Sequence, residues 1–174
     1  MKLTRKEFIF SSAAVAVAGC GSLGDVQERK AGCGMLKGIS PVVSPDLLKV
    51  LAEMGHGDEI VFSDGNFPGE SIGKIVLRAD ACGVPELLRA VLPLFPLDAY
   101  DNNVYLMDKT ESDKDLDIPI WDEYKEIAAE YTDKEPVFLE RFAFYERARK
   151  AYAVVVTGES AIYANVILKK GVVK

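Results

Sequence analysis

The sequence predicts a single α/β domain in three layers, with helices on both faces of a mainly parallel or mixed sheet. Apolar, strand-like segments alternate with amphipathic, helix-like segments along most of the chain, which is typical of a sheet covered on both faces. The length of 174 residues is sufficient for one continuous core. Hydrophobic residues make up 49% and charged residues 28% of the chain, which are ordinary values for a globular domain.

The best-marked element is a helix predicted over residues 44–55. Ser44 can cap its start, Pro45 suits its first turn, and Gly55 ends it. Periodicity and breaker residues predict further helices over 84–95, 119–131 and 141–150. Short apolar runs predict strands over 59–63, 74–79, 104–107, 137–140, 152–157 and 165–170. The chain shows no internal repeat, and no GxGxxG motif or P-loop that would indicate a nucleotide site.

The N-terminal part of the sequence differs from the rest. Basic residues near the start precede an apolar stretch over 8–18, and small residues then lead into Cys20. This order is typical of an export signal. The letters VAGC that end at Cys20 resemble a bacterial lipobox, in which the cysteine is lipidated, and the segment 4–8 resembles a twin-arginine signal with lysine in the second basic position. The alternatives are an N-terminal helix of the domain and a wrongly assigned start codon.

We therefore expect three parts in the chain. Residues 1–19 are predicted to be an export signal, 20–34 a lipid-anchor cysteine with a flexible tether, and 35–174 the folded domain. The protein would then be held on the periplasmic or cell-surface side of a bacterial membrane through the lipid anchor alone. If the N-terminal segment is not a functional signal, the protein would be cytoplasmic.

Charge and cysteine content exclude two classes of ligand. The net charge of −6 and the pI of about 4.9 leave no basic stripe for phosphate groups, so nucleic-acid binding is not expected. Neither Cys33 nor Cys82 has a second Cys or His at metal-ligand spacing, so zinc is not indicated. An oxidising compartment would permit a disulfide between these two cysteines, but free thiols are the favoured interpretation.

Polar residues gather near the ends of two predicted strands. Asp64 follows the strand 59–63, and Asn165 opens the last strand. Ligands of α/β sheets bind where strands end and loops converge. His56, the only histidine, lies between two glycines, which permit close backbone approach. These residues predict a polar pocket, with a His56–Asp64 pair as one hypothesis. A structural histidine and a turn-capping aspartate are the alternatives.

Three separated blocks of the chain resemble a known family. They read MLKGISPVVSPDLLKVLAEMGHGDEIVFSD, RADACGVPELLRAVLPLFPLD and LERFAFYERARKAYAVVVTGESAIYANVILKKGV. From Met35 to Val173 the sequence is similar to the fucose mutarotase branch of the ribose pyranase/fucose mutarotase family. The resemblance implies the fold of that family and covers nearly all of the chain outside the export segment.

The resemblance also implies roles for individual residues. His56, in the GHGDE block, corresponds to the proton donor, and Asp64 to the sugar-binding aspartate that closes the next strand. Arg141, before FAFYERA, corresponds to the arginine that characterises the fucose branch. In animal members, catalytic roles fall on the residues that correspond to Asp98 in PLD and Tyr145 in FYER.

The resemblance places a further sugar contact in the segment Tyr163, Ala164 and Asn165. Alanine stands at position 164 where the fucose branch usually has glycine, a departure that leans towards the ribose branch. For two of the implied residues a purely structural role is an equal alternative. Asp98 would then cap a helix end and Tyr145 would be a core aromatic residue.

The implied chemistry requires only proton transfer. Opening a sugar ring removes a proton from the anomeric hydroxyl and adds one to the ring oxygen, and re-closure gives the other anomer. A histidine can give and take protons near neutral pH, which suits His56 as the general acid/base. Tyr145, or Asp98 through another group, would handle the second proton. No metal, nucleotide or redox cofactor is expected.

The sequence therefore predicts a mutarotase that interconverts the α and β anomers of L-fucose. A D-ribose pyranase, which interconverts pyranose and furanose forms, is the alternative enzyme. A non-catalytic surface sugar-binding protein is the alternative of another class. The resemblance also implies a homo-oligomer with sites near the subunit interfaces. The monosaccharide is the only small-molecule partner expected.

Overall fold

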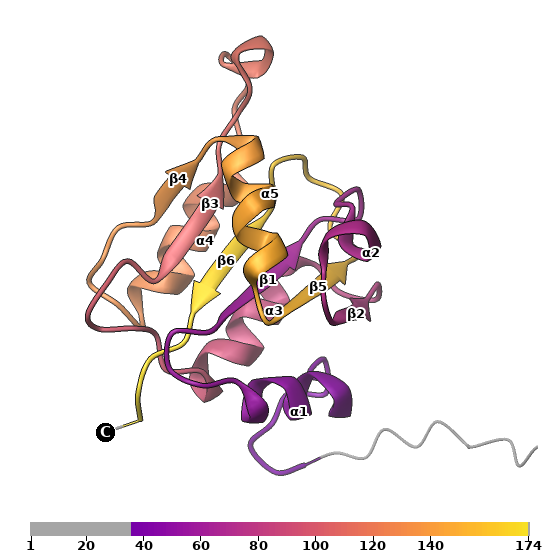
Figure 1. The fold of residues 1–174 in the computed structure, drawn as a ribbon, viewed down its shortest axis with the longest axis vertical. Coiled ribbons are helices and arrows are strands. Elements are labelled where there is room, and N and C mark those ends of the chain that lie inside the picture. Colours follow the sequence, from indigo (N-terminus) through magenta and orange to yellow (C-terminus); the bar gives the residue numbers. More distant parts are fainter. Residues whose placement is uncertain (1–35, 174) are drawn as a thin grey trace, which may run out of the picture. The chain divides into compact units, whose positions relative to one another are not determined.

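The computed structural model describes residues 36–173 of the chain (Figure 1). The predicted export signal, Cys20 and Cys33 lie outside the described residues, so the division of the chain at residues 19 and 34 stays a prediction. Cys82 is buried as a free thiol, and burial raises its pKa. No helix within the described range is long and apolar enough to cross a membrane.

A six-stranded sheet with the order β2-β5-β1-β6-β3-β4 forms the centre of the fold. Strand β6 pairs antiparallel with both β1 and β3, whereas the other pairings are parallel. The sheet is therefore mixed, with β6 alone running in the opposite direction. The strands are β1 (Glu59–Ser63), β2 (Val76–Ala79), β3 (Val104–Met107), β4 (Val137–Leu139), β5 (Ala153–Thr157) and β6 (Val166–Lys169).

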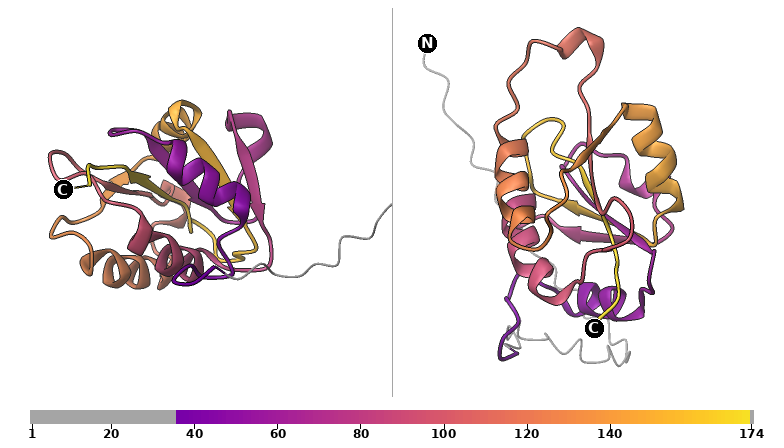
Figure 2. Two further views of the ribbon diagram at one scale, coloured as in Figure 1. Left: turned by 90° about the horizontal axis from the view of Figure 1, so that it is seen from below. Right: turned by 90° about the vertical axis from the view of Figure 1, so that its left-hand side faces the viewer.

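Helices cover both faces of this sheet (Figure 2). The larger core cluster joins the sheet to α1 (Pro45–Glu53), α3 (Val84–Val91) and α4 (Ile120–Ala129), and the smaller joins it to α2 (Gly69–Ile72) and α5 (Arg141–Lys150). Along β1, Ile60 and Phe62 enter the larger cluster and Val61 enters the smaller, because successive side chains of a strand point to opposite faces. The predicted three-layer α/β/α domain is confirmed.

Local sequence signals account for most helix boundaries. The hydroxyl of Ser44 accepts a hydrogen bond from the Leu47 N–H at 3.1 Å and caps α1 as predicted. The helix predicted over 84–95 gives way to a 3₁₀ turn, η1 (Leu92–Leu94), because Pro93 cannot continue the α-helical hydrogen bonding. A second 3₁₀ turn, η2 (Glu111–Asp113), lies between β3 and α4.

The short helix α2 was not predicted. Its four residues are fewer than a hydrophobic period needs in order to be recognised. Gly69 at its start lies against β5, where a Cβ atom would collide with Val156. This close approach explains the glycine, and it brings the chain that follows β1 back over the sheet.

Candidate active site

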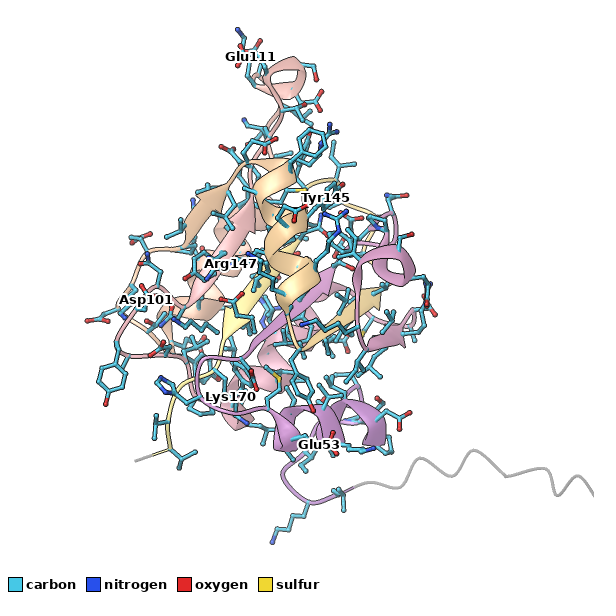
Figure 3. The ribbon with its side chains drawn as sticks, in the orientation of Figure 1. Glu53, Asp101, Glu111, Tyr145, Arg147 and Lys170 are labelled. Atoms are coloured by element: carbon cyan, nitrogen blue, oxygen red, sulfur yellow. The ribbon has the colours of Figure 1, made fainter. Side chains whose placement is uncertain are left out.

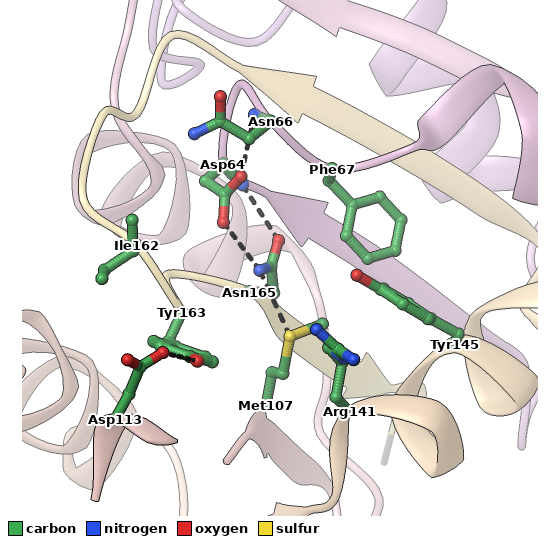
Figure 4. A pocket seen from close by; sticks show the side chains of 10 residues that line it. All are labelled: Asp64, Asn66, Phe67, Met107, Asp113, Arg141, Tyr145, Ile162, Tyr163 and Asn165. Carbon is green, nitrogen blue, oxygen red and sulfur yellow. Dashed lines mark hydrogen bonds between the residues drawn. The ribbon is translucent and has the colours of Figure 1, made fainter. Parts of the chain in front are cut away.

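A pocket of about 250 Å³ opens at the edge of the sheet where β1, β3 and β4 end (Figure 4). Its volume is below the roughly 300–1,000 Å³ of sites for drug-sized ligands, so it suits a small molecule. Carboxylate, amide, guanidinium and phenol groups line it together with a few apolar side chains. The lining residues are Asp64, Asn66, Phe67, Met107, Asp113, Arg141, Tyr145, Ile162, Tyr163 and Asn165.

Strand ends bring these side chains together. Asp64 is the first residue after β1, and Arg141 opens α5 shortly after β4. Tyr145 lies one helical turn beyond Arg141 and therefore on the same side of α5. Because β6 is antiparallel to β1, Asn165 at its start lies beside Asp64 at the end of β1. The structure thus brings Asp64 and Asn165 into one pocket at these strand ends, whereas His56 is not among the lining residues.

Asp64 and Asn165 form a reciprocal pair in the wall of the pocket. The Asp64 N–H donates to Asn165 Oδ1 at 3.1 Å, and Asn165 Nδ2 donates to Asp64 Oδ2 at 2.7 Å. The Asn66 N–H donates to Asp64 Oδ1 at 2.9 Å. The donors are neutral and Asp64 is only 4% exposed, so burial outweighs these bonds and raises the pKa of the carboxyl group. Asn165 therefore fixes the orientation of an acid that protonates more readily than usual.

Tyr163 forms another wall of the pocket, and both its backbone carbonyl and its side-chain hydroxyl make hydrogen bonds. Its φ of 58° is a left-handed backbone conformation that side-chain-bearing residues seldom adopt. Trp121 Nε1 donates to its carbonyl oxygen at 3.0 Å, and its hydroxyl donates to the Asp113 carboxylate. The Thr110 N–H also reaches the Tyr163 hydroxyl, at 3.4 Å. These contacts bind the 108–117 loop to the pocket.

Arg141 and Tyr145 line the remaining side. Arg141 Nε is buried and has no hydrogen-bond partner, and its guanidinium group lies 4.8 Å from the ring centre of Phe142. The Tyr145 ring meets Phe67 edge to face at 5.6 Å. A buried donor without an acceptor is costly in a folded protein. A ligand oxygen in the pocket would satisfy it.

Ala164 does not line the pocket, although the sequence predicted a sugar contact there. It is fully buried and its side chain belongs to the larger core cluster. Its carbonyl oxygen accepts a hydrogen bond from the Tyr124 hydroxyl at 3.2 Å. Ala164 therefore faces the helices, whereas its neighbours Tyr163 and Asn165 line the pocket.

His56 and Asp98 lie together at the other end of the strands, where β1 begins and β6 ends. His56 Nε2 lies 3.6 Å from Asp98 Oδ1, and the histidine side chain is 50% exposed. Asp98 is 2% exposed, accepts the Tyr100 N–H at 2.9 Å and lies 3.2 Å from Lys169 Nζ. The Tyr100 N–H and then Lys169 lower the pKa of Asp98. The two residues thus form a cluster of their own, with an ionised carboxylate.

Within one chain, the expected pair of His56 with Asp64 does not form. Strand β1 lies between them, and its five residues span about 16 Å at roughly 3.3 Å per residue. In Figure 3, Tyr145 lies toward the end of the strands that holds the pocket, and Lys170, whose carbonyl oxygen accepts the Gly57 N–H at 2.8 Å, lies toward the other end. The flanking glycine Gly57 has a φ of 86°, so the loop turn requires it.

Five lining residues were not predicted from the sequence, and one of them, Ile162, directly precedes the predicted Tyr163. Asn66 and Phe67 directly follow Asp64, so the rule that strand ends carry ligand sites would have included them. Met107, the last residue of β3, follows from the same rule. Asp113 carries no such signal, because its loop folds back onto Tyr163 only in the tertiary structure. Among residues 36–173, no group of three His, Cys, Asp or Glu side chains is placed to hold a metal ion.

The fold and the pocket together define an α/β protein with a site for a small, polar ligand. The chain belongs to the RbsD / FucU transport protein family, whose model matches residues 37–173. This confirms the family resemblance found in the sequence. The match does not reach the N-terminal segment.

Individual relatives are similar over the same range. A fucose mutarotase from Danio rerio is 54% identical over 147 residues, which are 80% of this chain and 95% of the relative. A fucose mutarotase from Streptococcus pneumoniae, crystallised in complex with L-fucose, has a TM-score of 0.75 and 46% identity over 80% of this chain and 100% of that one. FucU from Bifidobacterium longum has a TM-score of 0.76 and 53% identity over 79% and 100%.

Proposed function

We propose that this protein is a mutarotase that interconverts the α and β anomers of L-fucose. The observation that carries the proposal is the small polar pocket, in which Asp64, Arg141, Tyr145 and Asn165 converge. The similarity of the chain to fucose mutarotases supports the choice of sugar. Ring opening and closure need positioned proton donors and acceptors, and each such group contributes roughly 10²- to 10⁴-fold to the rate.

The pocket residues divide into binding and proton-transfer groups. Asp64 can accept hydrogen bonds from sugar hydroxyls while Asn165 holds it in place. Arg141 has an unused donor for a sugar oxygen, and Tyr163 supplies an aromatic wall. Tyr145 carries a hydroxyl on the pocket wall and is our candidate for one proton transfer.

His56 and Asp98 would act in the pocket of an adjacent copy of the chain. His56 is half-exposed and cannot reach the pocket of its own chain, which lies beyond the length of β1. A homo-oligomer that places this edge of one subunit against the pocket of the next would bring the two groups together. His56 would then serve as the general acid/base for a sugar bound mainly by the neighbouring subunit.

Anomer exchange measured by NMR tests the proposed reaction. The purified protein should accelerate exchange of L-fucose above the buffer rate, and by more than it accelerates D-ribose at equal enzyme concentration. A clear preference for ribose, with pyranose–furanose exchange, would identify a pyranase. Ala164 does not shape the pocket wall, so its departure from the glycine of the fucose branch does not argue for ribose. Sugar binding without accelerated exchange would identify a binding protein.

A subunit-mixing experiment tests the shared site. His56→Asn and Arg141→Met should each be inactive alone, because each damages every site of its own oligomer. After subunit exchange at equal amounts, about a quarter of the interfaces would join an intact His56 edge to an intact pocket. Recovery of about a quarter of wild-type activity supports the shared site. No recovery despite proven subunit exchange refutes it.

We also propose that residues 1–19 direct export and that Cys20 is lipidated. The proposal is supported by the order of basic, apolar and small residues before Cys20. Cys20→Ser should abolish labelling by a fatty-acid analogue and release the protein from the membrane fraction. A wild-type protein found in the cytoplasm with residues 1–34 intact would refute the proposal.

A further inference from the structure

Lys169, at the end of β6, connects two carboxylates beside His56. Its Nζ lies 3.2 Å from Asp98 Oδ2 and 2.9 Å from Asp101 Oδ2, and its side chain is 17% exposed. The main chain joins the same partners, because the Asp98 N–H donates to the Lys169 carbonyl oxygen at 3.1 Å. The end of β6 therefore holds Asp98 through both its backbone and its side chain.

These contacts leave the Asp98 carboxylate a single orientation. Lys169 takes Oδ2, whereas Oδ1 accepts the Tyr100 N–H at 2.9 Å and faces His56 Nε2 at 3.6 Å. Asp98 is 2% exposed, and an ionised carboxylate that is buried without a cation would tend to take up a proton. Lys169 is the cation that lies against it.

We propose that Lys169 is a positioning residue for the mutarotase reaction, because its ammonium group keeps the Asp98 carboxylate ionised and turned toward His56. This inference rests on the proposed function, since Lys169 affects turnover only through Asp98 and His56. The lowered pKa of Asp98, to which the Tyr100 N–H and then Lys169 contribute, agrees with the contacts. An anion facing Nε2 stabilises the protonated imidazole and fixes the plane of the ring.

The other charged groups around Asp98 have separable roles. His56 faces it from the loop before β1, and Asp101 shares Lys169 with it from the following turn. Lys134 approaches from beyond α4, but it donates to the carbonyl oxygens of Ala99, at 2.9 Å, and of Asp98, at 3.4 Å. Lys134 thus stabilises the loop through backbone carbonyl oxygens and not through the Asp98 carboxylate. A Lys134 variant is therefore a matched control, because it removes a lysine that stabilises the same loop without removing the cation beside Asp98.

The test compares Lys169→Met, Lys169→Arg and Lys134→Met in the full-length protein. Removing the cation should raise the midpoint of the Asp98 carboxyl titration, followed by carbon-13 NMR without sugar, by about one pH unit or more. The ratio of Lys169→Met to wild-type L-fucose exchange should then fall, by up to about fivefold for a shift of one pH unit, as the pH is lowered from 7 to 4. Sugar affinity should stay near the wild-type value. Lys169→Arg should restore both readouts.

Lys134→Met should lower the melting temperature while leaving the Asp98 midpoint and the pH profile unchanged. An unchanged Asp98 midpoint in Lys169→Met, or a ratio to wild type that does not vary with pH, would overturn the role of Lys169. If Lys169→Met does not fold, Lys169→Gln is measured against the same criteria. A wild-type protein without exchange activity overturns the proposed function. A raised Asp98 midpoint in Lys169→Met would then show that the contact itself was interpreted correctly.

Discussion

The two ends of β1 hold two aspartates that are buried to a similar degree but have opposite pKa shifts. Asp64, at the carboxyl end, is 4% exposed and receives hydrogen bonds from neutral amides. Asp98, at the amino end, is 2% exposed and lies against Lys169. Burial raises the pKa of the first, whereas the Tyr100 N–H and Lys169 lower the pKa of the second. Burial among neutral donors thus dominates the pKa shift of Asp64, whereas the Tyr100 N–H and the Lys169 cation dominate that of Asp98.

Because of this difference, we expect the two ends of β1 to have different functions. A carboxyl group held by amides provides directional hydrogen bonds, which suits recognition of sugar hydroxyls. An ionised carboxylate beside a histidine suits proton transfer. The pocket end would then determine which sugar binds, and the His56–Asp98 end how fast its ring opens. Four predictions, from the largest expected effect to the smallest, test this division.

The largest effect is expected for His56→Asn. Exchange of L-fucose should fall at least about tenfold, the lower side of what acid–base groups contribute. Sugar affinity should change much less, because the pocket end is untouched. The fold should persist, since a half-exposed loop side chain contributes little to packing. A lower melting temperature with unchanged exchange per folded molecule would instead make His56 a structural residue.

The next effect is expected for Asn165→Leu at the pocket end. The substitution leaves the Asp64 carboxylate without its 2.7 Å donor and should lower the free energy of unfolding by about 1–3 kcal/mol. L-fucose affinity should fall as well, because Asp64 is no longer oriented. Urea unfolding and NMR titration with sugar measure the two effects. Asn102→Ala, at an exposed position, is the control and should stay within about 0.5 kcal/mol. Equal losses in both variants would contradict this role of Asn165.

A smaller effect is expected for Asp113→Asn in the 108–117 loop. Its carboxylate accepts from the Tyr163 hydroxyl and lines the pocket, so L-fucose affinity should weaken by about three- to tenfold. Asp117→Asn, on the same loop but exposed, should leave affinity unchanged. Saturation-transfer NMR compares the variants. If both variants bind like the wild type, the loop is not part of the binding end.

The smallest effect is expected in the pH dependence of folding stability, to which Asp98 and Asp64 should contribute with opposite signs. Asp98 has a folded pKa below the ordinary value of 3.8, so its contribution to stability is present above pH 3.8 and is lost as the pH falls through the folded pKa. Asp64 has a raised folded pKa, so its contribution is present below pH 3.8 and is lost as the pH rises through the folded value.

Thermal melting of Asp98→Asn and Asp64→Asn from pH 3 to pH 7 measures these slopes. The stability deficit of Asp98→Asn should shrink toward acid pH, whereas that of Asp64→Asn should shrink toward neutral pH. Parallel slopes would mean that the two carboxyl groups have the same environment in solution, and the contrast between the two ends would be lost.

Most of the fold could be predicted because its elements depend on near neighbours in the chain. Ser44 and Pro45 start α1, and the apolar run 59–63 forms β1 with both faces buried. Such signals act within a few residues, so the sequence displays them directly. The four-residue α2 lies below the length at which a period can be recognised.

The layers, the strand ends and half of the residues that line the pocket could be predicted from the amino-acid sequence. Which of these residues meet depends on the tertiary structure. Inserting β6 antiparallel between β1 and β3 places Asn165 against Asp64 across a sequence separation of 101 residues. His56 and Asp64 are close in sequence, but they lie at opposite ends of the extended strand β1. Each residue of a strand adds about 3.3 Å to the distance between its ends. Proximity along the chain is not proximity in space when a strand intervenes, and strand order is set by long-range packing that local patterns do not contain.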